Sequence, residues 1–268
     1  MKLDLERYVQ ELNYLVERKD ISQNTARTYV SCLNVIKQEF NELTPESLKS
    51  FLMNRLNNRK QFLKYVSAIR KYEQLVLKQD KGILFGEPEI ELFMHFRKEN
   101  TSKGKELSIS ESKALRKINA LRNKKLKYAL RLQLKSGLRV SEVSELEKED
   151  IKFIDGKIKI YVRHGKGDKA RKVNVIEDDY LYKNLSDYIN ECKSKKLFYS
   201  SEYLRHKAAE YGMETHDLRR LNARRRLKTE IKKGKTRKEA KKIVQKELGH
   251  ESTRITDLYI QERRQKVE

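Results

Sequence analysis

The chain has 268 residues, and 62 Lys and Arg against 39 Asp and Glu give it a formal net charge of +23. This length allows one large domain or two of ordinary size. No apolar run approaches the roughly 20 residues of a membrane-spanning helix, and no apolar signal segment follows Met1. We therefore expect neither a membrane protein nor a secreted protein. Cys32 and Cys192 lie far apart, so we expect both to be reduced, in an intracellular protein without a membrane partner.

The positive charge lies mainly in the second part of the chain. Residues 1–100 hold 17 Lys and Arg and 14 Asp and Glu, whereas residues 101–268 hold 45 and 25. A positive field of this strength attracts DNA, RNA or an anionic membrane surface. We therefore expect a polyanion to contact chiefly the second part.

Helical periodicity predicts a bundle of about four helices in the first hundred residues. Ser22 is placed to cap the second helix, and the third begins with Thr44 as N-cap and Pro45 at the first helical position. The fourth helix sets an apolar face opposite a basic one. Two interpretations remain open for the basic face, a solvated surface or a row of cations that follows a DNA backbone. The members of this face are Lys60, Lys64, Arg70 and Lys71, and Arg55 and Arg59 lie beside them in the sequence.

Glycine and proline mark the end of this bundle, because Gly82, Gly86 and Pro88 interrupt regular structure. Residues 99–107 are polar and lack apolar periodicity. Ser108-Ile109-Ser110-Glu111 then has the form of a capping box that restarts helical structure. The predicted organisation is a helical domain over residues 1–98, a linker over 99–107 and a second domain over 108–268.

The second domain is predicted to begin with two helices, roughly 110–120 and 124–135. A helix exit follows at Ser136-Gly137-Leu138, and Ser141 is placed to cap the next helix. Arg139 then falls in the turn between two helices, where a side chain can project into a cleft.

A change of period predicts a small sheet. Residues 151–154 and 157–162 alternate or are β-branched around Asp155-Gly156, which is a strong hairpin signal. A second turn over 165–169 leads to a third strand near 172–176 and places Lys166 at its tip. All that follows is predicted to be helical, so the expected fold class is mainly α with one small antiparallel sheet.

Residues 219–246 form the most basic stretch, in which 14 of 28 residues are Lys or Arg and only Glu230 and Glu239 are acidic. Gly234 separates two helical pieces, and a capping box over 236–239 restarts the second. A solubilising surface is the plain interpretation, but this density favours phosphate contact, and the lack of interleaved aromatic residues favours duplex DNA over single strands. The cations expected to contact DNA are Arg59, Lys60 and Lys64 in the first domain and Arg220, Arg224, Lys232, Lys233, Lys235, Lys241 and Lys242 in this stretch.

The candidate catalytic residues lie in five short segments. Each of these residues alone is also typical of a surface cation, a helix cap or a packed aromatic ring. In chain order the segments are Gly137-Leu138-Arg139-Val140-Ser141-Glu142, Gly165-Lys166-Gly167-Asp168-Lys169, His216-Asp217-Leu218-Arg219, Leu248-Gly249-His250 and Tyr259. Together they resemble the tyrosine recombinases, the phage-integrase-type family of site-specific recombinases. The first hundred residues resemble this family only in architecture, as its helical, SAM-like core-binding domain.

The resemblance implies a reaction in which Tyr259 attacks a DNA phosphate and forms a 3′-phosphotyrosine link. Arg139 and Arg219 would hold the non-bridging oxygens, and His250 would supply another donor. The resemblance also implies that His216 accepts or relays the tyrosine proton and that Lys166 protonates the leaving 5′ oxygen, with Lys169 and Lys172 as competitors for the acid role. Rejoining would then need no ATP and no metal, and no cofactor is expected.

The resemblance further implies that duplex DNA is the partner and that the protein acts as a homo-tetramer, a dimer of dimers, on DNA. The free protein would be a monomer or a weak oligomer, and an accessory DNA-bending protein is compatible with this scheme. The expected location is the cytoplasm, in association with the nucleoid. Departures from the family pattern are Arg220-Leu221, where a His-Thr-like pair is frequent, and a wide interval between His216 and His250.

Two alternatives belong to other functional classes. One is a catalytically silent DNA-binding or architectural protein with the same fold, and the other is a DNA-relaxing enzyme similar to type IB topoisomerases. A binding protein has no need of Tyr259 or Lys166. The separate helical domain and the context of Arg139 favour a recombinase over a topoisomerase.

Overall fold

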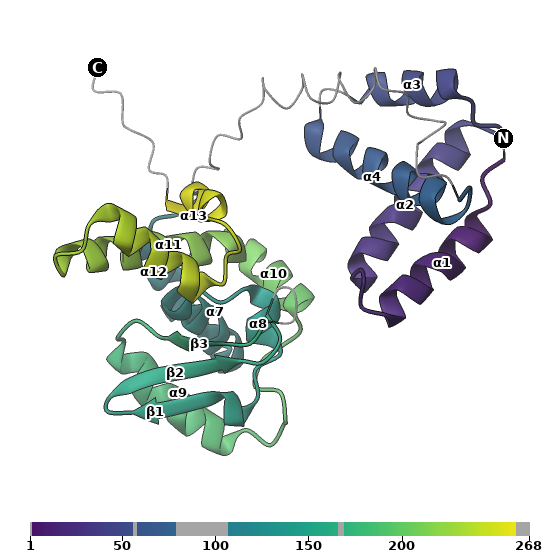
Figure 1. The fold of residues 1–268 in the computed structure, drawn as a ribbon. Helices are drawn as coiled ribbons and strands as arrows, with labels where there is room; N and C mark the ends of the chain where they lie inside the picture. The colour runs from purple at the N-terminus through teal and green to yellow at the C-terminus, as the bar shows by residue number, and fades with distance from the viewer. Residues whose placement is uncertain (1, 56–57, 79–106, 166–168, 261–268) are drawn as a thin grey trace. The chain divides into compact units, whose positions relative to one another are not determined.

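The structure is a computed structural model that describes residues 2–55, 58–78, 107–165 and 169–260. The chain forms two compact units, Met1–Ser102 and Lys103–Glu268. Each unit has its own apolar core, and Figure 1 draws the helices and strands of both units. Within the described residues, no helix combines the length and the apolar character that a membrane crossing requires. The predicted boundaries at Gly82 to Pro88 and the linker over 99–107 fall almost wholly outside the described residues.

The first unit is a helical bundle around one apolar core. Ser22 accepts a hydrogen bond from the amide of Thr25 at 3.1 Å and caps its helix, as predicted. Thr44 and Ser47 form a reciprocal capping box at the next helix, which begins with Pro45 as predicted. The helices are α1 (Leu5–Glu17), α2 (Gln23–Glu39), α3 (Pro45–Met53) and α4 (Arg59–Leu75).

Helix α4 has the buried and the basic face that its sequence predicts. Lys60 and Lys64 on the basic face are exposed. Arg55 does not join them, because its Nη2 lies 2.7 Å from Glu39 Oε2 and its guanidinium lies 3.5 Å from the centre of the Phe51 ring. The bundle itself therefore holds Arg55. The buried residues of this helix are Phe62, Tyr65, Val66, Ala68, Ile69, Tyr72 and Glu73.

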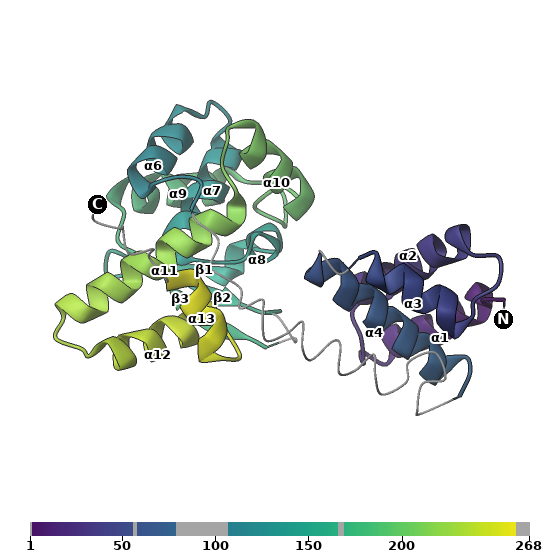
Figure 2. The ribbon, with the colours of Figure 1, turned by 90° about the horizontal axis from the view of Figure 1, so that it is seen from above.

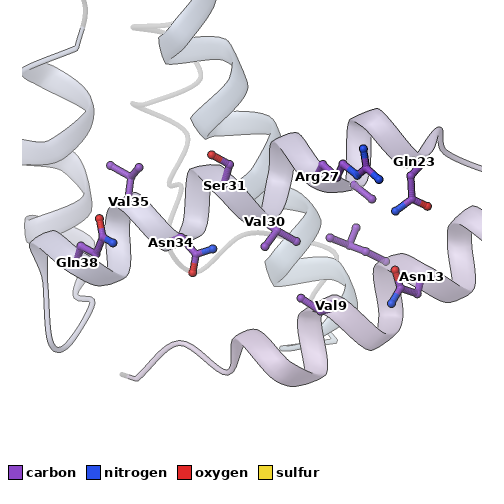
Figure 3. Close-up of a pocket in the computed structure, with 11 residues that line it drawn as sticks. Val9, Asn13, Gln23, Arg27, Val30, Ser31, Asn34, Val35 and Gln38 are labelled. Atoms are coloured by element: carbon purple, nitrogen blue, oxygen red, sulfur yellow. The ribbon is translucent and has the colours of Figure 1, made fainter. Parts of the chain in front are cut away.

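A hollow of about 520 Å³ lies between α1 and α2 (Figure 3). Apolar and uncharged polar side chains line it together with one cation. None of the residues predicted to be catalytic belongs to this unit. Its lining includes Val9, Asn13, Gln23, Arg27, Val30 and Asn34.

The second unit is mainly helical with one small sheet, which confirms the predicted fold class (Figure 2). The sheet is antiparallel in the order β1-β2-β3, with Ile160 of β2 opposite both Ile151 and Val173. The strands are β1 (Ile151–Ile154), β2 (Lys157–Val162) and β3 (Arg171–Asn174). The helices are α6 (Glu111–Ala120), α7 (Lys124–Ser136), α8 (Val140–Ser144), α9 (Asp179–Glu191), α10 (Ser201–Glu210), α11 (Thr215–Lys232), α12 (Arg237–Leu248) and α13 (Thr253–Ile260).

The hairpin between β1 and β2 follows the predicted pattern. Asp155 and Gly156 both have positive φ values, 49° and 71°, which suits a two-residue turn between twisted strands. The third strand is Arg171–Asn174 instead of the predicted 172–176. The amide of Val175 still donates to the carbonyl of Ile158 at 2.9 Å, so the pairing continues one residue beyond the strand.

Two predicted helix caps are wrong. Ser110, not Ser108, caps α6 by accepting from the amide of Lys113. Ser141 lies inside α8, whose N-cap is Arg139, and the carboxylate of Glu142 accepts the amide hydrogen of Arg139 at 2.7 Å. Ser108 instead donates to the distant Asp217, and at α8 a charged side chain, Glu142, supplies the acceptor, so the local pattern alone does not identify either start.

Gly137 ends α7 in the left-handed region, with φ of 72°, and leads directly to Arg139. A Cβ at this position would lie 2.5 Å from Asn222 Oδ1 and 2.9 Å from a methyl group of Leu248. Asn222 is buried and donates to the carbonyl of Leu134, so it has little freedom to retreat. The glycine is therefore required by both conformation and space.

We expect Gly137→Ala to lower the free energy of unfolding by about 2–4 kcal/mol, because it adds left-handed strain and disturbs a buried hydrogen bond. Gly234→Ala is the matched control, since Gly234 also has positive φ, 87°, but has nothing within 4 Å of an added Cβ. Its expected cost is about 1 kcal/mol. Urea unfolding measures both, and equal losses would show that the contact with Asn222 carries no energy.

Candidate active site

Five of the six residues predicted to be catalytic come together in the second unit. Arg139 lies in the turn before α8, His216 and Arg219 lie on the first turns of α11, and Tyr259 lies on α13. His250 follows Gly249, which ends α12. The sixth residue, Lys166, and most of its turn lie outside the described residues.

Tyr259 is the centre of the group, with only 9% of its surface exposed. A hydrogen bond of 2.8 Å joins its hydroxyl oxygen to Nε2 of His216. Its ring lies between two imidazoles, with centre-to-centre distances of 5.1 Å to His216 and 4.6 Å to His250. The tyrosine hydroxyl therefore has a titratable partner at hydrogen-bond distance.

His216 is exposed to solvent, and its lowered pKa keeps it neutral at physiological pH. Burial of part of its ring and the charges of Arg220 and Arg219 lower its pKa below the ordinary value, against the smaller opposing effects of Asp217 and Glu214. A neutral imidazole can accept a proton from the hydroxyl that it contacts. The contact with Tyr259 therefore suits His216 to the role of base.

His250 is buried and fixed by its neighbours. A hydrogen bond of 3.0 Å joins its Nδ1 to the hydroxyl of Thr256 on α13. Burial, followed by the charges of Arg219, Arg139 and Arg171, lowers the pKa of His250 to about 3. The imidazole is thus neutral at physiological pH. Thr256 orients it, a role that the sequence did not reveal, although Thr256 stands three residues before Tyr259.

Arg219 is completely buried beneath Tyr259. Its Nη1 donates to the carbonyl of Gly137 at 2.5 Å, its Nη2 donates to the carbonyl of Leu248 at 2.6 Å, and its guanidinium carbon lies 5.8 Å from the centre of the Tyr259 ring. Within the described structure its Nε has no hydrogen-bond partner. Burial and the nearby charge of Arg139 lower its pKa to about 10, so it stays protonated at pH 7.

Glu142 holds three arginines at the floor of the site. Arg139 Nη1 and Arg171 Nη1 each donate to its Oε1 at 2.8 Å, Arg171 Nη2 donates to Oε2 at 2.8 Å, and Arg219 Nη1 lies 3.9 Å from Oε2. Burial alone would raise the pKa of this carboxyl group, but the hydrogen bonds and charge of Arg171, with those of Arg139 and Arg219, hold it below its ordinary value. Glu142 is therefore an anion that fixes the arginines.

Sequence reasoning missed the role of Glu142 and did not single out Arg171. Arg171 begins β3, and its Nε donates to the carbonyl of Glu247 at the end of α12. Its side chain also packs against Gly249, where a Cβ would approach it within 3.2 Å. The one available signal was its position between Lys169 and Lys172, the two residues weighed against Lys166 for the acid role. Arg171 thus joins the sheet to both the Arg139 turn and the segment that carries His250.

Helix α13 packs on α11 and α12 of the same chain. A small apolar cluster separate from the main core joins the three helices, and Arg224 Nε donates to the carbonyl of Tyr259 at 3.3 Å. The tyrosine and its partner imidazoles therefore belong to one chain in this structure. The cluster consists of Ala223, Leu227, Ala240, Val244, Leu248, Tyr259 and Ile260.

The cations predicted to bind DNA lie in different surroundings. Lys232 and Lys242 are exposed on α11 and α12. Lys233 and Lys235 form ion pairs with Glu230 at 2.9 and 2.8 Å. Three others make contacts inside the site or near it: Lys241 pairs with Asp257, Arg220 pairs with Asp217 and Arg224 contacts Tyr259. Arg59, Lys60 and Lys64 belong to α4 in the other unit.

In the described part of the chain, no group of three His, Cys, Asp or Glu side chains lies close enough to hold a metal ion. The charged groups around Tyr259 are arginines and the carboxylates that hold them. Such a set matches an anionic ligand, because guanidinium groups pair with carboxylate or phosphate oxygens.

Comparison with known proteins supports the resemblance that the motifs suggest. The model of the phage integrase family matches residues 107–266. The chain therefore belongs to this family, the tyrosine recombinases, whose members break and rejoin DNA.

Individual relatives agree with this assignment. Tyrosine recombinase XerD of Staphylococcus aureus (strain Mu50 / ATCC 700699) is 26% identical over 151 residues, which are 54% of this chain and 48% of that protein, so the chain spans about half the length of the curated relatives it matches. A lambda integrase(75-356) dimer bound to a COC' core site has a TM-score of 0.65 at 16% identity, over 96% of this chain and 95% of that one. A lambda integrase tetramer bound to a Holliday junction has a TM-score of 0.63 at 16% identity, over 93% and 76% of the two chains.

Proposed function

We propose that the protein is a site-specific DNA recombinase that cuts and rejoins duplex DNA through a 3′-phosphotyrosine intermediate. The observation that carries this proposal is the hydrogen bond between Tyr259 and the neutral His216, beside the buried charge of Arg219. Membership of the tyrosine recombinase family supports it. A nucleophile, a base and fixed cations are the groups that phosphodiester transfer needs.

In the proposed cleavage step, the hydroxyl proton of Tyr259 passes to Nε2 of His216 as the tyrosine oxygen bonds to phosphorus. The bond between phosphorus and the 5′ oxygen breaks, and a proton supplied by Lys166 leaves that strand end as a 5′-hydroxyl. Rejoining is the reverse, with a 5′-hydroxyl attacking the phosphotyrosine. Because the ester link keeps the bond energy, the cycle needs no ATP.

The cations supply electrostatic stabilisation in this scheme. Arg139, with its side chain 25% exposed, is the more accessible of the two predicted phosphate ligands, and Arg219 places a charge directly beneath Tyr259. The negative charge that develops on the phosphate oxygens would be stabilised by these fixed guanidinium groups. Glu142 lies 2.8 Å from Arg139 and 3.9 Å from Arg219, so its carboxylate would hold both guanidinium groups in place before the charge develops.

Duplex DNA is the proposed substrate, contacted along its backbone by the cations of α11 and α12. The exposed Lys232 and Lys242 support this placement, and each phosphate contact would contribute to a strong dependence of affinity on salt. We further propose a dimer of dimers on DNA, for which the fold shared with a tetrameric integrase on a Holliday junction gives support.

The test is covalent capture on nicked DNA that contains a randomised segment, in buffer with EDTA. The proposal predicts protein–DNA adducts that survive SDS, and sequencing of the captured DNA should give a common pair of half-sites. Absence of adducts would favour a silent binding protein, and adducts without sequence preference would favour a topoisomerase-like enzyme. A strict requirement for Mg²⁺ would contradict the proposed mechanism.

A further inference from the structure

The residue after Arg219 is a second arginine, and its side chain also lies against the nucleophile. The guanidinium carbon of Arg220 lies 5.7 Å from the centre of the Tyr259 ring, which equals the approach of Arg219 to within 0.1 Å. Only 12% of the Arg220 side chain is exposed. Its Nε is buried and has no hydrogen-bond partner within the described structure. An unpaired cationic donor thus sits beside the tyrosine.

A buried carboxylate fixes the direction of this arginine. Asp217 is 0% exposed, and its Oδ1 accepts from Nη1 of Arg220 at 2.9 Å. Its other oxygen, Oδ2, accepts from the amide of Ser108 at 2.9 Å and from the hydroxyl of Ser108 at 2.6 Å. These contacts explain why Ser108 does not cap α6. Burial would raise the pKa of Asp217. The hydrogen bonds from Ser108 and the charge and hydrogen bond of Arg220 outweigh burial, so this pKa is lower than its ordinary value.

The same arginine acts on the base. The charged groups that face His216 are Arg220 and Arg219, which disfavour its protonation, and Asp217 and Glu214, which favour it. Arg220 is the strongest of these charges. Because His216 contacts the hydroxyl of Tyr259, Arg220 lies beside both groups between which the proton of the proposed reaction would move.

We infer that Arg220 is a third arginine of the reaction centre, which stabilises the negative charge that develops on the oxygen of Tyr259, and that Asp217 and Ser108 are its positioning residues. This inference rests on the proposed function and replaces the expectation that Arg220 contacts the DNA surface. The unpaired Nε gives the guanidinium a donor that an oxyanion can accept. The carboxylate of Asp217 keeps the guanidinium from turning toward solvent.

The first experiment separates the rate of the chemical step from DNA affinity. Arg220→Gln should lower the single-turnover rate of adduct formation at saturating nicked DNA by on the order of tenfold to a hundredfold, with the Kd for DNA changed less than about twofold. Arg220→Lys keeps the positive charge but lacks the planar guanidinium group, so its single-turnover rate should lie between the rates of wild type and Arg220→Gln. A weaker Kd at an unchanged saturated rate would overturn the inference.

Arg131→Gln is the matched control for a structural effect. Arg131 forms an equally buried ion pair, with 11% of its side chain exposed and contacts of 2.8 and 2.9 Å to Asp178. The Arg131→Gln substitution should lower the Tm at least as much as Arg220→Gln does. It should leave the rate of adduct formation by the folded protein at saturating DNA unchanged. If the two variants reduce that rate equally, the role of Arg220 is structural and the inference fails.

A double-mutant cycle tests the positioning residues. Asp217→Asn keeps an acceptor for Ser108 but loses the charge that holds Arg220, so it should slow adduct formation in the wild-type background. In the Arg220→Gln background the same substitution should have little further effect, because coupled residues give non-additive changes. Additive losses would show that Asp217 does not act through Arg220.

A second measurement needs no DNA and therefore distinguishes failure of this inference from failure of the proposed function. NMR titration of the five histidines in the free protein, with the His216 signal assigned by its loss in His216→Gln, should show a higher pKa of His216 in Arg220→Gln and no change in Arg131→Gln. If wild type forms no adduct, the proposed function fails, and the titration still decides whether Arg220 acts on His216. An unchanged titration of His216 in Arg220→Gln would overturn the inference.

Discussion

Tyr259→Phe is expected to abolish the covalent protein–DNA adduct, a loss of at least about 10⁴-fold, because it removes the nucleophilic oxygen of the proposed reaction. The substitution keeps the ring that packs between His216 and His250 and in the apolar cluster of α11, α12 and α13. It deletes one hydrogen bond, to His216. We therefore expect the free energy of unfolding to fall by no more than about 1.5 kcal/mol.

Tyr188→Phe is the matched control for the loss of a hydroxyl group. The hydroxyl of Tyr188 donates to the carbonyl of Leu197 at 2.6 Å, in the main core of the second unit. This variant should lose a similar amount of stability and keep full adduct formation. Adducts that persist in Tyr259→Phe would assign the attack to another residue and would end the present mechanism.

Glu142→Ala is expected to have the largest effect on stability, a loss of about 3–5 kcal/mol, because it leaves buried arginines without their counter-charge. Arg171 would lose both of its hydrogen bonds to the carboxylate, and Arg139 would lose the cap on its own amide. Adduct formation should fall as well, since the two arginines proposed to hold the phosphate lose their common support. Urea unfolding at pH 7 and single-turnover capture measure these two effects.

The effect of Glu142 should depend on pH with a definite sign. Its folded-state pKa is below the ordinary value, so it contributes stability above about pH 4.5, and this contribution is lost as the pH falls through the folded-state pKa. The difference in stability between wild type and Glu142→Gln should therefore shrink in acid. A difference that stays constant from pH 7 to pH 3 would show that the charge of Glu142 is not what stabilises the arginines.

Much of the fold was predictable because its signals are local. Asp155-Gly156 predicts its hairpin from two adjacent residues, and Ser22 and Thr44 cap helices that begin directly after them. Gly137 predicts the exit of α7 because few other residues adopt its backbone conformation. The motifs around Arg139, Arg219 and Tyr259 likewise predicted which side chains would meet.

The remainder depends on contacts between distant parts of the chain. Ser108 and Ser110 are equally good caps by local pattern, and only the bond from Ser108 to Asp217, 109 residues away, separates them. The role of Arg171 depends on Glu142 and on the end of α12, neither of which is near it in sequence. Such pairings are set by tertiary packing, which a single sequence does not record.

The complete burial of Arg219 has a consequence for how DNA affinity should be understood. Both terminal nitrogens already donate to carbonyl oxygens, and Tyr259 covers the guanidinium. Because Arg219 is completely buried, a phosphate in the proposed reaction could reach it only in molecules in which the groups that cover it have moved, so the closed arrangement would compete with the substrate. The apparent affinity for a cleavable site is then the intrinsic affinity reduced by the fraction of molecules that are open. Contacts far from the phosphate that favour opening would strengthen binding without touching the DNA at the point of attack.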